Sequence, residues 1–479
     1  MSVALRELRA VGGQHHATAA VHSPRNVNEL RSLLEQTTRL GLRLTLVGSQ
    51  RSFGEQFLPP LRTECVTLSQ LGGRVERLSH DADGHLWVRA PGHTTFHDLC
   101  AAVPGFIPFH PPTGDCISIA GALAGCSHDA VGFLADNVRA FTVMTGDGRV
   151  HECRVDAGNV AEELFRLIPG SFGALGAILS VELRLRAIRA GQRAEINVLY
   201  RGHDPGFAAL DRLESAFRDG DYALGRGLFF FGRRRQNVLF GDRLRTLDPD
   251  ERLPPLLLTD DATTRNIVAQ ALANRFPGLA HRVQPWVLKP GRRFQAELYG
   301  FSFYQRSYDR SFAFLSSDDP LACLLREIGV DPRLAVCHQT FVVPVAVCRE
   351  FLDAYFGLFA AYPDLESRLE QQDMIRLPQC PYPLHGSHGM PGGSYLFTAS
   401  FSVRPTGPEQ QRCQRFLSEV AEQVWPALGV KVLLLKQSHC DDASLRQMHA
   451  PFIAQLSALK HHVDPRGLWT SRLLERLGL

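Results

Sequence analysis

The sequence predicts an α+β protein with two domains, and three observations lead to this prediction. Its 479 residues exceed what one domain of about 100 to 200 residues holds. Helical and strand patterns alternate along the chain, and hairpin turns separate many of the strands. After about residue 190, Arg, Phe and Pro become frequent. We therefore expect a first domain over 1–188 that 430–479 completes, and a second domain over 189–429.

Composition excludes several classes of protein. Hydrophobic residues make up 44% and charged residues 21%, as in ordinary globular proteins. The net charge of +3 favours no nucleic-acid partner. No signal-peptide pattern or membrane-length apolar run occurs, which predicts a cytoplasmic protein. The 11 cysteines are scattered and never spaced C-x-x-C, so neither a disulfide framework nor a zinc ribbon is expected.

The first elements follow from periodicity and turn chemistry. Residues 25–41 predict a helix, with Asn28 as its N-cap and Gly41 at its end. The apolar run 42–48 predicts a buried strand that enters a turn. Residues 61–153 predict mainly strands and hairpins, interrupted by a short helix at 94–103 and a small-residue loop and helix at 113–132.

The later elements repeat this mixture. Residues 159–168 predict a helix, and 170–188 a glycine-rich turn that leads into a long strand. The runs 227–232 and 337–345 predict strands, and 347–362 predicts a helix. At the end we expect a strand at 430–439 and a helix at 441–465.

Three glycine-rich clusters could hold a ligand. The turn VGSQRSFGEQ (47–56) exposes backbone N–H groups that suit phosphate oxygens. The tract PPTGDCISIAGALAG (111–125) lets a backbone approach a cofactor closely. GSFGALGAI (170–178) reads G-x-x-G-x-x-G, which is neither the dinucleotide fingerprint nor a P-loop. Each cluster alone fits an unliganded turn or a tightly packed helix at least as well.

In this order, the three clusters resemble the FAD-binding domain of the vanillyl-alcohol-oxidase, or PCMH-type, superfamily of oxidoreductases over about residues 20–188. The segments HQTFVVP (338–344), VKVLLLKQS (430–438) and LKHHVDPRGLWTSRLLERLGL (459–479) resemble decaprenylphosphoryl-ribose oxidases and the related aldonolactone and alditol oxidases most closely. The resemblance implies a PCMH-type FAD-binding domain and an α+β substrate (cap) domain.

The resemblance also implies the cofactor and its contacts. Covalent members carry a histidine where this chain has Arg51, and bicovalent members add a cysteine where it has Gly114, two residues before Cys116. We therefore expect non-covalent FAD. The implied cofactor-binding residues are Gly48, Ser49, Gln50, Arg51, Ser52, Phe53, Gly54, Thr113, Gly114, Ser118, Ala120, Gly121, Ala122, Gly125, Cys126, His128, Gly173, Gly176 and Ile178.

Catalytic candidates follow from what alcohol oxidation needs. Lys436, at the end of an apolar strand, could act as a base or stabilise developing negative charge, and His128 is the second candidate base or hydrogen-bond donor. A strand-end lysine that points into water is the structural alternative.

The substrate-binding candidates are His338, Gln339, Thr340 and Phe53. His338 and Thr340 share a strand face, so Gln339 would meet substrate only if the register slipped by one residue. Phe53 stands where the ribose oxidases have a tyrosine. The histidine pairs of the chain lack the acidic or cysteine partners of a metal site, so no metal is assigned.

The expected activity is oxidation of a hydroxyl group of a sugar, polyol or sugar-derived metabolite, with hydride transfer to flavin N5 and then to oxygen or another acceptor. Two alternatives stay open: oxidation of a non-sugar natural-product alcohol or amine, and a flavin-free scaffold, which the bulky Gln50 suggests.

Partners beyond the small-molecule substrate are less defined by the sequence. The basic run 232–245, together with 289–294, fits a solvated face or a peripheral contact with an anionic membrane, a phosphate or an acidic sugar. A reductase partner that completes an epimerisation also stays open.

Overall fold

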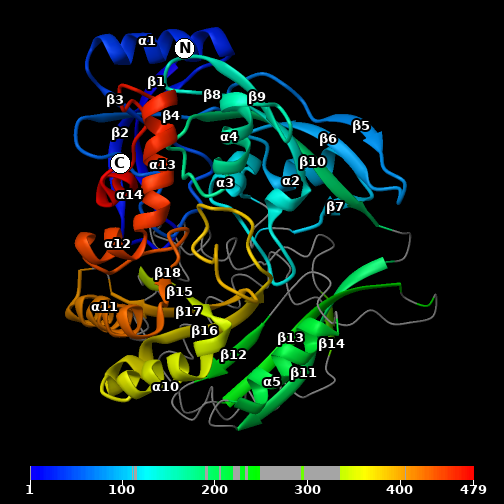
Figure 1. Cartoon of the computed structure of the whole chain (residues 1–479), viewed down its shortest axis with the longest axis vertical. Coiled ribbons are helices and arrows are strands. Elements are labelled where there is room, and N and C mark those ends of the chain that lie inside the picture. Colours follow the sequence, from blue (N-terminus) through cyan, green and yellow to red (C-terminus); the bar gives the residue numbers. More distant parts are fainter. Residues whose placement is uncertain are drawn as a thin grey trace, which may run out of the picture.

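In the part of the chain that the structure describes, helices pack on three β-sheets, in agreement with the predicted α+β class (Figure 1). The computed structural model describes residues 2–110, 112, 116–188, 192–203, 207–219, 227–231, 236–246, 248, 293–295, 335–404 and 406–479. Two sheets lie in the upper half of Figure 1, and the third crosses the lower half.

The first sheet is built by the N-terminal segment. Its strands, in spatial order, are β1 (Ser2–Arg9), β2 (His16–Ser23), β4 (Thr63–Val66) and β3 (Arg43–Leu46). Helix α1 (Val27–Arg39) joins β2 to β3. Its N-cap is Asn26, whose side chain accepts a hydrogen bond from the Glu29 N–H, so the prediction of Asn28 was wrong by two residues. Gly41, with φ of 65°, follows the end of the helix as predicted.

The second sheet is antiparallel and contains two of the predicted hairpins, which its last strand separates. Its strands are β5 (Glu76–His80), β6 (Leu86–Pro91), β10 (Ala177–Ala187), β8 (Val138–Met144) and β9 (Val150–Arg154), and β7 (Phe106–Pro108) also pairs with β10. The helices around it are α2 (Phe96–Ala102), α3 (Ile119–Ala124), the 3-10 turn η1 (Leu134–Asn137) and α4 (Asn159–Leu167). Gly176 begins the long strand with φ of 144°, where a Cβ would collide with the Met144 carbonyl oxygen.

The third sheet belongs to the middle of the chain. Its strands, in spatial order, are β14 (Arg293–Gln295), β11 (Gln192–His203), β13 (Gln236–Thr246), β12 (Leu228–Phe231), β16 (Leu369–Leu377), β17 (Ser394–Val403), β15 (Ala335–Pro344) and β18 (Lys431–Val432). Its helices are α5 (Phe207–Arg218), α10 (Cys348–Phe359) and α11 (Pro408–Leu428), with the 3-10 turns η2 (Val345–Val347) and η3 (Pro363–Arg368).

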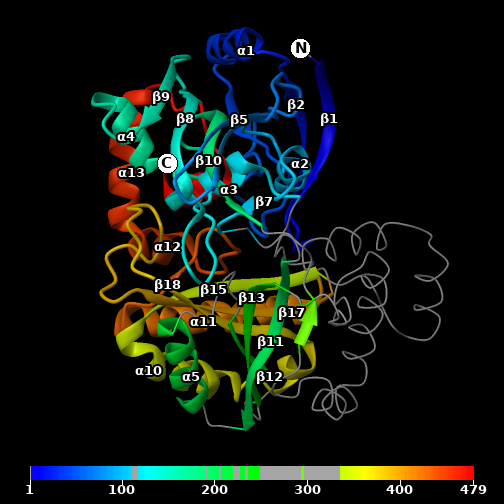
Figure 2. The same ribbon diagram turned by 90° about the vertical axis from the view of Figure 1, so that its right-hand side faces the viewer.

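The two faces of the third sheet meet different surroundings. On β15, Cys337, Phe341 and Val343 pack into an aromatic core with residues of α10 and α11. The alternate residues His338 and Thr340 therefore lie on the opposite face. In Figure 2 that face is turned toward the first two sheets, while α10 and α11 lie on the far side.

The C-terminal segment returns to the first two sheets. Its helices are α12 (Asp442–Met448), α13 (Ala450–Val463) and α14 (Arg472–Leu477), so the single helix predicted at 441–465 is interrupted at His449. The predicted strand 430–439 is a strand only at Lys431–Val432 and then turns. Beyond α13, Leu44 of β3 accepts from the Thr470 N–H and donates to the Leu468 carbonyl, which ties the end of the chain to the first sheet.

A buried ion pair fastens this return. The Lys460 ammonium donates to the Asp464 carboxylate at 2.7 Å, to the Trp469 carbonyl at 2.7 Å and to the Ala174 carbonyl at 3.3 Å. Asp464 also accepts from the backbone N–H groups of Leu468 and Trp469. The pair thus connects α13 to the glycine-rich turn that precedes β10.

Some sequence predictions lie outside what the structure describes. Of the basic run 232–245 and 289–294, the structure describes the strands β13 and β14 but none of the arginine side chains. Among the described segments, no helix combines the length and apolarity that a membrane crossing demands. The domain boundaries at 188 and 429 stay a prediction.

Candidate active site

The turn after β3 is brought beside the small-residue tract that leads into α3. A Cβ on Gly48 would lie 3.0 Å from the Ser118 Oγ, and a Cβ on Gly121 would lie 2.9 Å from the same atom. Ser118 caps α3, because its Oγ accepts from the Gly121 N–H at 3.3 Å. Gly48 and Gly121 are both exposed. Two accessible glycine backbones thus flank the buried Ser118 hydroxyl. We call this arrangement of Gly48, Ser118 and Gly121 the glycine cradle; a side chain in place of either glycine would fill it.

The predicted cofactor residues fall into two groups. The first reaches the surface and includes Gly48, Ser49, Gln50, Arg51, Ser52, Ala120, Gly121 and Gly173. The second is buried and includes Phe53, Gly54, Ser118, Ala122, Gly125, Cys126, Gly176 and Ile178. Thr113 and Gly114 lie outside the described residues. Gln50 has φ of 58°, so a side chain occupies a left-handed position that costs about 1–2 kcal/mol relative to glycine.

Several buried members of this set have structural reasons of their own. A Cβ on Gly125 would lie 2.5 Å from the Leu435 side chain. Ala122 and Ile178 pack in the core of the second sheet, and Cys126 packs in a smaller core with Phe133 and Leu433. These residues are therefore explained by packing in the protein core, and contact of their side chains with the cofactor stays a prediction.

Three predicted site residues form one stack. The rings of Phe53 and His338 lie parallel, with centroids 4.3 Å apart. The Lys436 Nζ lies 4.8 Å from the centroid of the Phe53 ring, at cation–π distance. His338 Nδ1 is 2.6 Å from the Ser400 Oγ of β17. Residues that are far apart in the sequence therefore meet where the turn 47–56 faces the third sheet.

Two buried amides hold this stack together. Gln437 accepts the His338 N–H at 2.7 Å and donates to the Phe53 carbonyl at 3.0 Å. Gln56 donates to the carbonyls of Leu434 and Lys436, at 2.6 and 2.8 Å. The sequence analysis assigned no role to either amide. The signal that could have found them is an uncharged polar residue within an otherwise buried segment, which must find hydrogen-bond partners inside the protein.

Burial disfavours the charged form of Lys436. Burial lowers the pKa of Lys436 to about 8, and the carboxylate of Asp373 acts in the opposite direction. At neutral pH the ammonium form therefore still predominates, although deprotonation occurs at a much lower pH than for a lysine in water.

His128 and His385 are neutral partners at this site. His128 Nδ1 donates to the Cys126 carbonyl at 3.3 Å, which leaves Nε2 as an acceptor. Burial, and then the charge of Lys436, lower its pKa to about 4. The His385 ring meets that of His128 edge to face, with centroids 5.2 Å apart. Because the Ser387 N–H donates to His385 Nδ1, the proton of His385 is on Nε2.

The face of the third sheet that these residues meet is polar. Thr340, Thr398 and Asp373 are direct partners across β15, β17 and β16, and the Thr340 and Thr398 hydroxyls are 3.0 Å apart. His338 pairs with Ser400 in the next row. Gln339 is turned to the other face, where it donates to the Leu417 carbonyl of α11, so the structure offers it no substrate contact.

Asp373 escaped the sequence analysis because β16 has no clear period. Its two faces read Gln372, Met374 and Arg376 on one side and Asp373 and Ile375 on the other, so each mixes polar and apolar side chains. Such a strand cannot be predicted from its own hydrophobic periodicity and is recognised only in the structure, where it pairs with its neighbours.

Buried polar atoms without a partner gather around the stack. Within the described residues, the Nε2 atoms of His338 and His385 and the Oγ of Ser438 have no hydrogen-bond partner. Such atoms are costly unless something completes them. Together with the glycine cradle they fit a bound cofactor and substrate. No group of three side chains suited to a metal ion occurs in the described parts of the chain.

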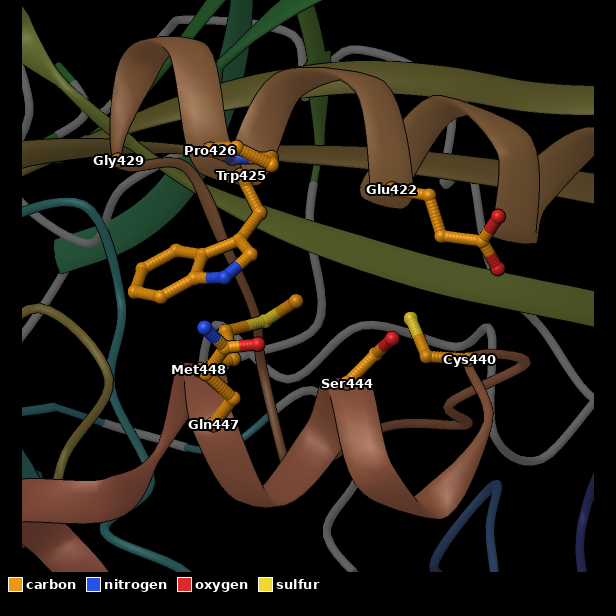
Figure 3. A pocket seen from close by; sticks show the side chains of 8 residues that line it. All are labelled: Glu422, Trp425, Pro426, Gly429, Cys440, Ser444, Gln447 and Met448. Carbon is orange, nitrogen blue, oxygen red and sulfur yellow. The ribbon is translucent and has the colours of Figure 1, made fainter.

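A cavity of about 450 Å³ lies outside this site, between α11 and α12 (Figure 3). The Trp425 indole faces Met448 across it. The other lining residues are Glu422, Pro426, Gly429, Cys440, Ser444 and Gln447. None of the predicted site residues lines it.

A comparison with known protein families identified a match in the first part of the chain. Residues 18–154 match the family model described as FAD binding domain, a range that includes the turn 47–56, α3 and His128. No curated protein matches the chain. The match supports the PCMH-type superfamily of FAD-binding oxidoreductases and argues against the flavin-free alternative. FAD is the cofactor of this chain, and the chain is an FAD-dependent oxidoreductase.

Proposed function

We propose that the protein oxidises a hydroxyl group of a sugar, polyol or sugar-derived metabolite with non-covalently bound FAD. The observation that carries this proposal is the Lys436 ammonium held against the Phe53–His338 stack, opposite a sheet face of hydroxyl groups. Bound FAD supplies the hydride acceptor for such a reaction. The backbones at 48–51 and 118–121 would hold its phosphates and approach it closely.

Lys436 and His128 would divide the handling of the hydroxyl proton. The Lys436 ammonium stabilises negative charge as it develops on the substrate oxygen. His128, neutral with an acceptor Nε2, receives the hydroxyl hydrogen bond and can take the proton. His338 is held by Ser400 and Gln437 and forms the floor beneath Phe53, with Thr340 beside it. These roles need a substrate whose reacting group is a hydroxyl.

Non-covalent binding follows from the chemistry of the turn. Arg51 stands where covalent members carry histidine, and a guanidinium cannot form that link. Its positive charge suits the phosphates of FAD instead.

The test begins with protein purified in the presence of FAD and precipitated with acid. Yellow colour in the supernatant is the expected result, and colour in the pellet would contradict the non-covalent assignment. Anaerobic mixing with alditols, aldoses and aldonolactones should then bleach the flavin with at least one compound. If the bound flavin responds to none of these compounds, the proposed substrate class is wrong.

A further inference from the structure

Arg476, in the last turn of α14, has a partly buried side chain whose three nitrogens all have partners. Its Nη2 donates to the Cys440 carbonyl at 2.6 Å, and its Nη1 donates to the Ser438 carbonyl at 3.1 Å. Its Nε donates to the Asp442 carboxylate of α12 at 2.8 Å. Nη1 also lies 3.4 Å from a carboxylate oxygen of Glu55. Only 20% of the side chain is exposed, so these contacts are shielded from most of the solvent.

These contacts join two segments that meet beside the stack. The Glu55 carboxylate belongs to the turn 47–56, and the two carbonyls belong to the segment that follows Lys436. The two segments touch directly, because a Cβ on Gly54 would lie 2.9 Å from the Lys436 carbonyl oxygen. Arg476 therefore binds the second segment just beyond its closest approach to the first.

The segment after the candidate lysine is held from two sides. Toward the third sheet, the Gln437 side chain accepts the His338 N–H at 2.7 Å, and the His439 N–H donates to the Gln339 side chain at 2.9 Å. Toward α14, Arg476 binds the carbonyls of the two alternate residues. Loss of the Arg476 side chain would release the second side and leave the bonds toward the sheet in place.

A guanidinium group suits this position better than an ammonium group. It is planar and presents N–H donors in several fixed directions, so one side chain can bind two carbonyls and a carboxylate at once. A lysine at the same place would keep the positive charge but could not span these acceptors. Substitution by lysine therefore separates the geometry of Arg476 from its charge.

We propose that Arg476 is a positioning residue for Lys436. By holding the segment after Lys436 against the turn 47–56, it supports the placement that Gln56 and Gln437 give to the lysine, and it keeps water away from the ammonium group. Arg476 acts in this role only through Lys436. The inference rests on the proposed function, in which the charge of Lys436 acts on the substrate oxygen.

The experiment uses the FAD-loaded protein and two variants, Arg476→Lys and Arg476→Ala. The first variant keeps the charge, and the second leaves room for added methylguanidinium. Arg43→Lys and Arg43→Ala are the matched controls, because Arg43 pairs with Glu475 of the same helix at an exposed site.

Two measurements are made on each protein. Competitive acetylation over a series of pH values, resolved by mass spectrometry, gives the midpoint at which Lys436 becomes reactive. The references are the other lysines of the chain, Lys289, Lys431 and Lys460. Anaerobic flavin reduction by alditols gives kcat and KM.

In the wild type, Lys436 should become reactive near pH 8, since burial lowers its pKa to about 8. Both Arg476 variants should move this midpoint upward by about one pH unit, because water that reaches the ammonium group relieves the effect of burial. They should lower kcat about tenfold with little change in KM, because the charge is misplaced while the polar sheet face remains. Methylguanidinium should restore both values in Arg476→Ala only, and the Arg43 variants should match the wild type.

An unchanged Lys436 midpoint in both Arg476 variants would overturn the inference, even with slower flavin reduction, because Arg476 would then only fasten α14. A midpoint that moves in Arg476→Ala but not in Arg476→Lys would also overturn it, because charge and not geometry would be the cause. If Arg476→Ala does not fold, Arg476→Lys decides by the same midpoint. If no alditol reduces the wild-type flavin, the proposed function fails, while the acetylation, which needs no substrate, still decides about Arg476.

Discussion

The ammonium group of Lys436 lies against the aromatic ring of Phe53, which belongs to the turn of predicted FAD-binding residues. In the proposed reaction, this charge would stabilise the negative charge that develops on the substrate oxygen. It is also sensitive to pH, since burial lowers its pKa to about 8. Two measurements follow from this one group.

Reduction of the flavin by substrate is expected to slow as pH rises through about 8, because Lys436 then loses the charge that stabilises the substrate oxygen. His128 has a pKa of about 4 and stays neutral over this range, so it adds no second inflection. Anaerobic stopped-flow kinetics should show this decline in wild type, and a slow, pH-independent rate in Lys436→Met. A rate that increases through pH 8 would instead make Lys436 the base.

Lys436→Met is expected to stabilise the protein. A lysine with a pKa lowered from 10.5 to about 8 destabilises the folded state most below pH 8, and this effect disappears as pH rises to about 10.5, where both states are neutral. We expect a gain of about 1–3 kcal/mol at pH 7, after allowance for partial exposure. Urea unfolding at pH 7 and pH 10 measures it; an equal gain at both would assign the effect to packing instead of charge.

At the scale of elements, the site depends on the joining of two loops. The turn after β3 and the turn after β18 share no secondary structure, and Gln56 and Gln437 supply the hydrogen bonds between them. Gln437 also holds His338 of β15, because its side-chain oxygen accepts the His338 N–H. The position of Lys436 is therefore set by side-chain amides.

Gln437→Leu should leave a buried N–H on His338 and a buried carbonyl on Phe53 without partners. At about 1–3 kcal/mol for each of the two groups, the loss of stability should be about 2–6 kcal/mol. Substrate reduction of the flavin should fall more than flavin content, because the stack is disturbed before the glycine cradle. Gln36→Leu, at an exposed site on α1, is the control; a loss of stability no larger than that of the control would refute the role of Gln437.

Elements with a clear period could be predicted from the sequence, and those without it could not. The helix at 25–41 was found because its apolar residues recur with the helical period, and the strand at 337–345 because it is a short run that contains the β-branched and aromatic residues typical of strands. The run VKVLLLKQSH looked like one strand because it is apolar, yet it turns after Val432 and buries Leu433 and Leu434. A turn that is buried on all sides is as apolar as a buried strand, so composition does not distinguish the two.

The parts of the candidate site that lie within short sequence motifs could be predicted from the sequence. The glycine turn, Lys436 and the face shared by His338 and Thr340 follow from short segments. Gln56 and His385 were missed because they contact Lys436 and His128, which lie hundreds of residues away along the chain. Asp373 was missed because its neighbour Thr398 belongs to another strand. No single-sequence pattern contains that information.

The whole molecule depends on its C-terminal return. Helices α13 and α14 pack into the core of the second sheet, and the Lys460–Asp464 pair anchors this packing to the turn at Ala174. Removing one partner from a buried pair leaves an uncompensated charge.

Asp464→Ala should therefore destabilise the protein by about 3–5 kcal/mol and reduce flavin retention. Arg415→Ala, which breaks an exposed pair with the same spacing on α11, should lower the free energy of unfolding much less, because water and salt screen that pair. Urea unfolding monitored by flavin release compares the two. Equal effects would mean that the buried pair contributes no more than a surface pair.

The bonds between Leu44 and residues 468–470 also order events during synthesis. β3 leads directly into the turn 47–56, and, among the described residues, those at 468–470 pair with the edge of β3 that faces away from β4. The ribosome delivers the turn hundreds of residues before it delivers the segment that fixes its strand. The final pairing of β3 therefore cannot form until residues 468–470 have been translated, and a chain that ended before them would leave that edge of β3 without these hydrogen bonds.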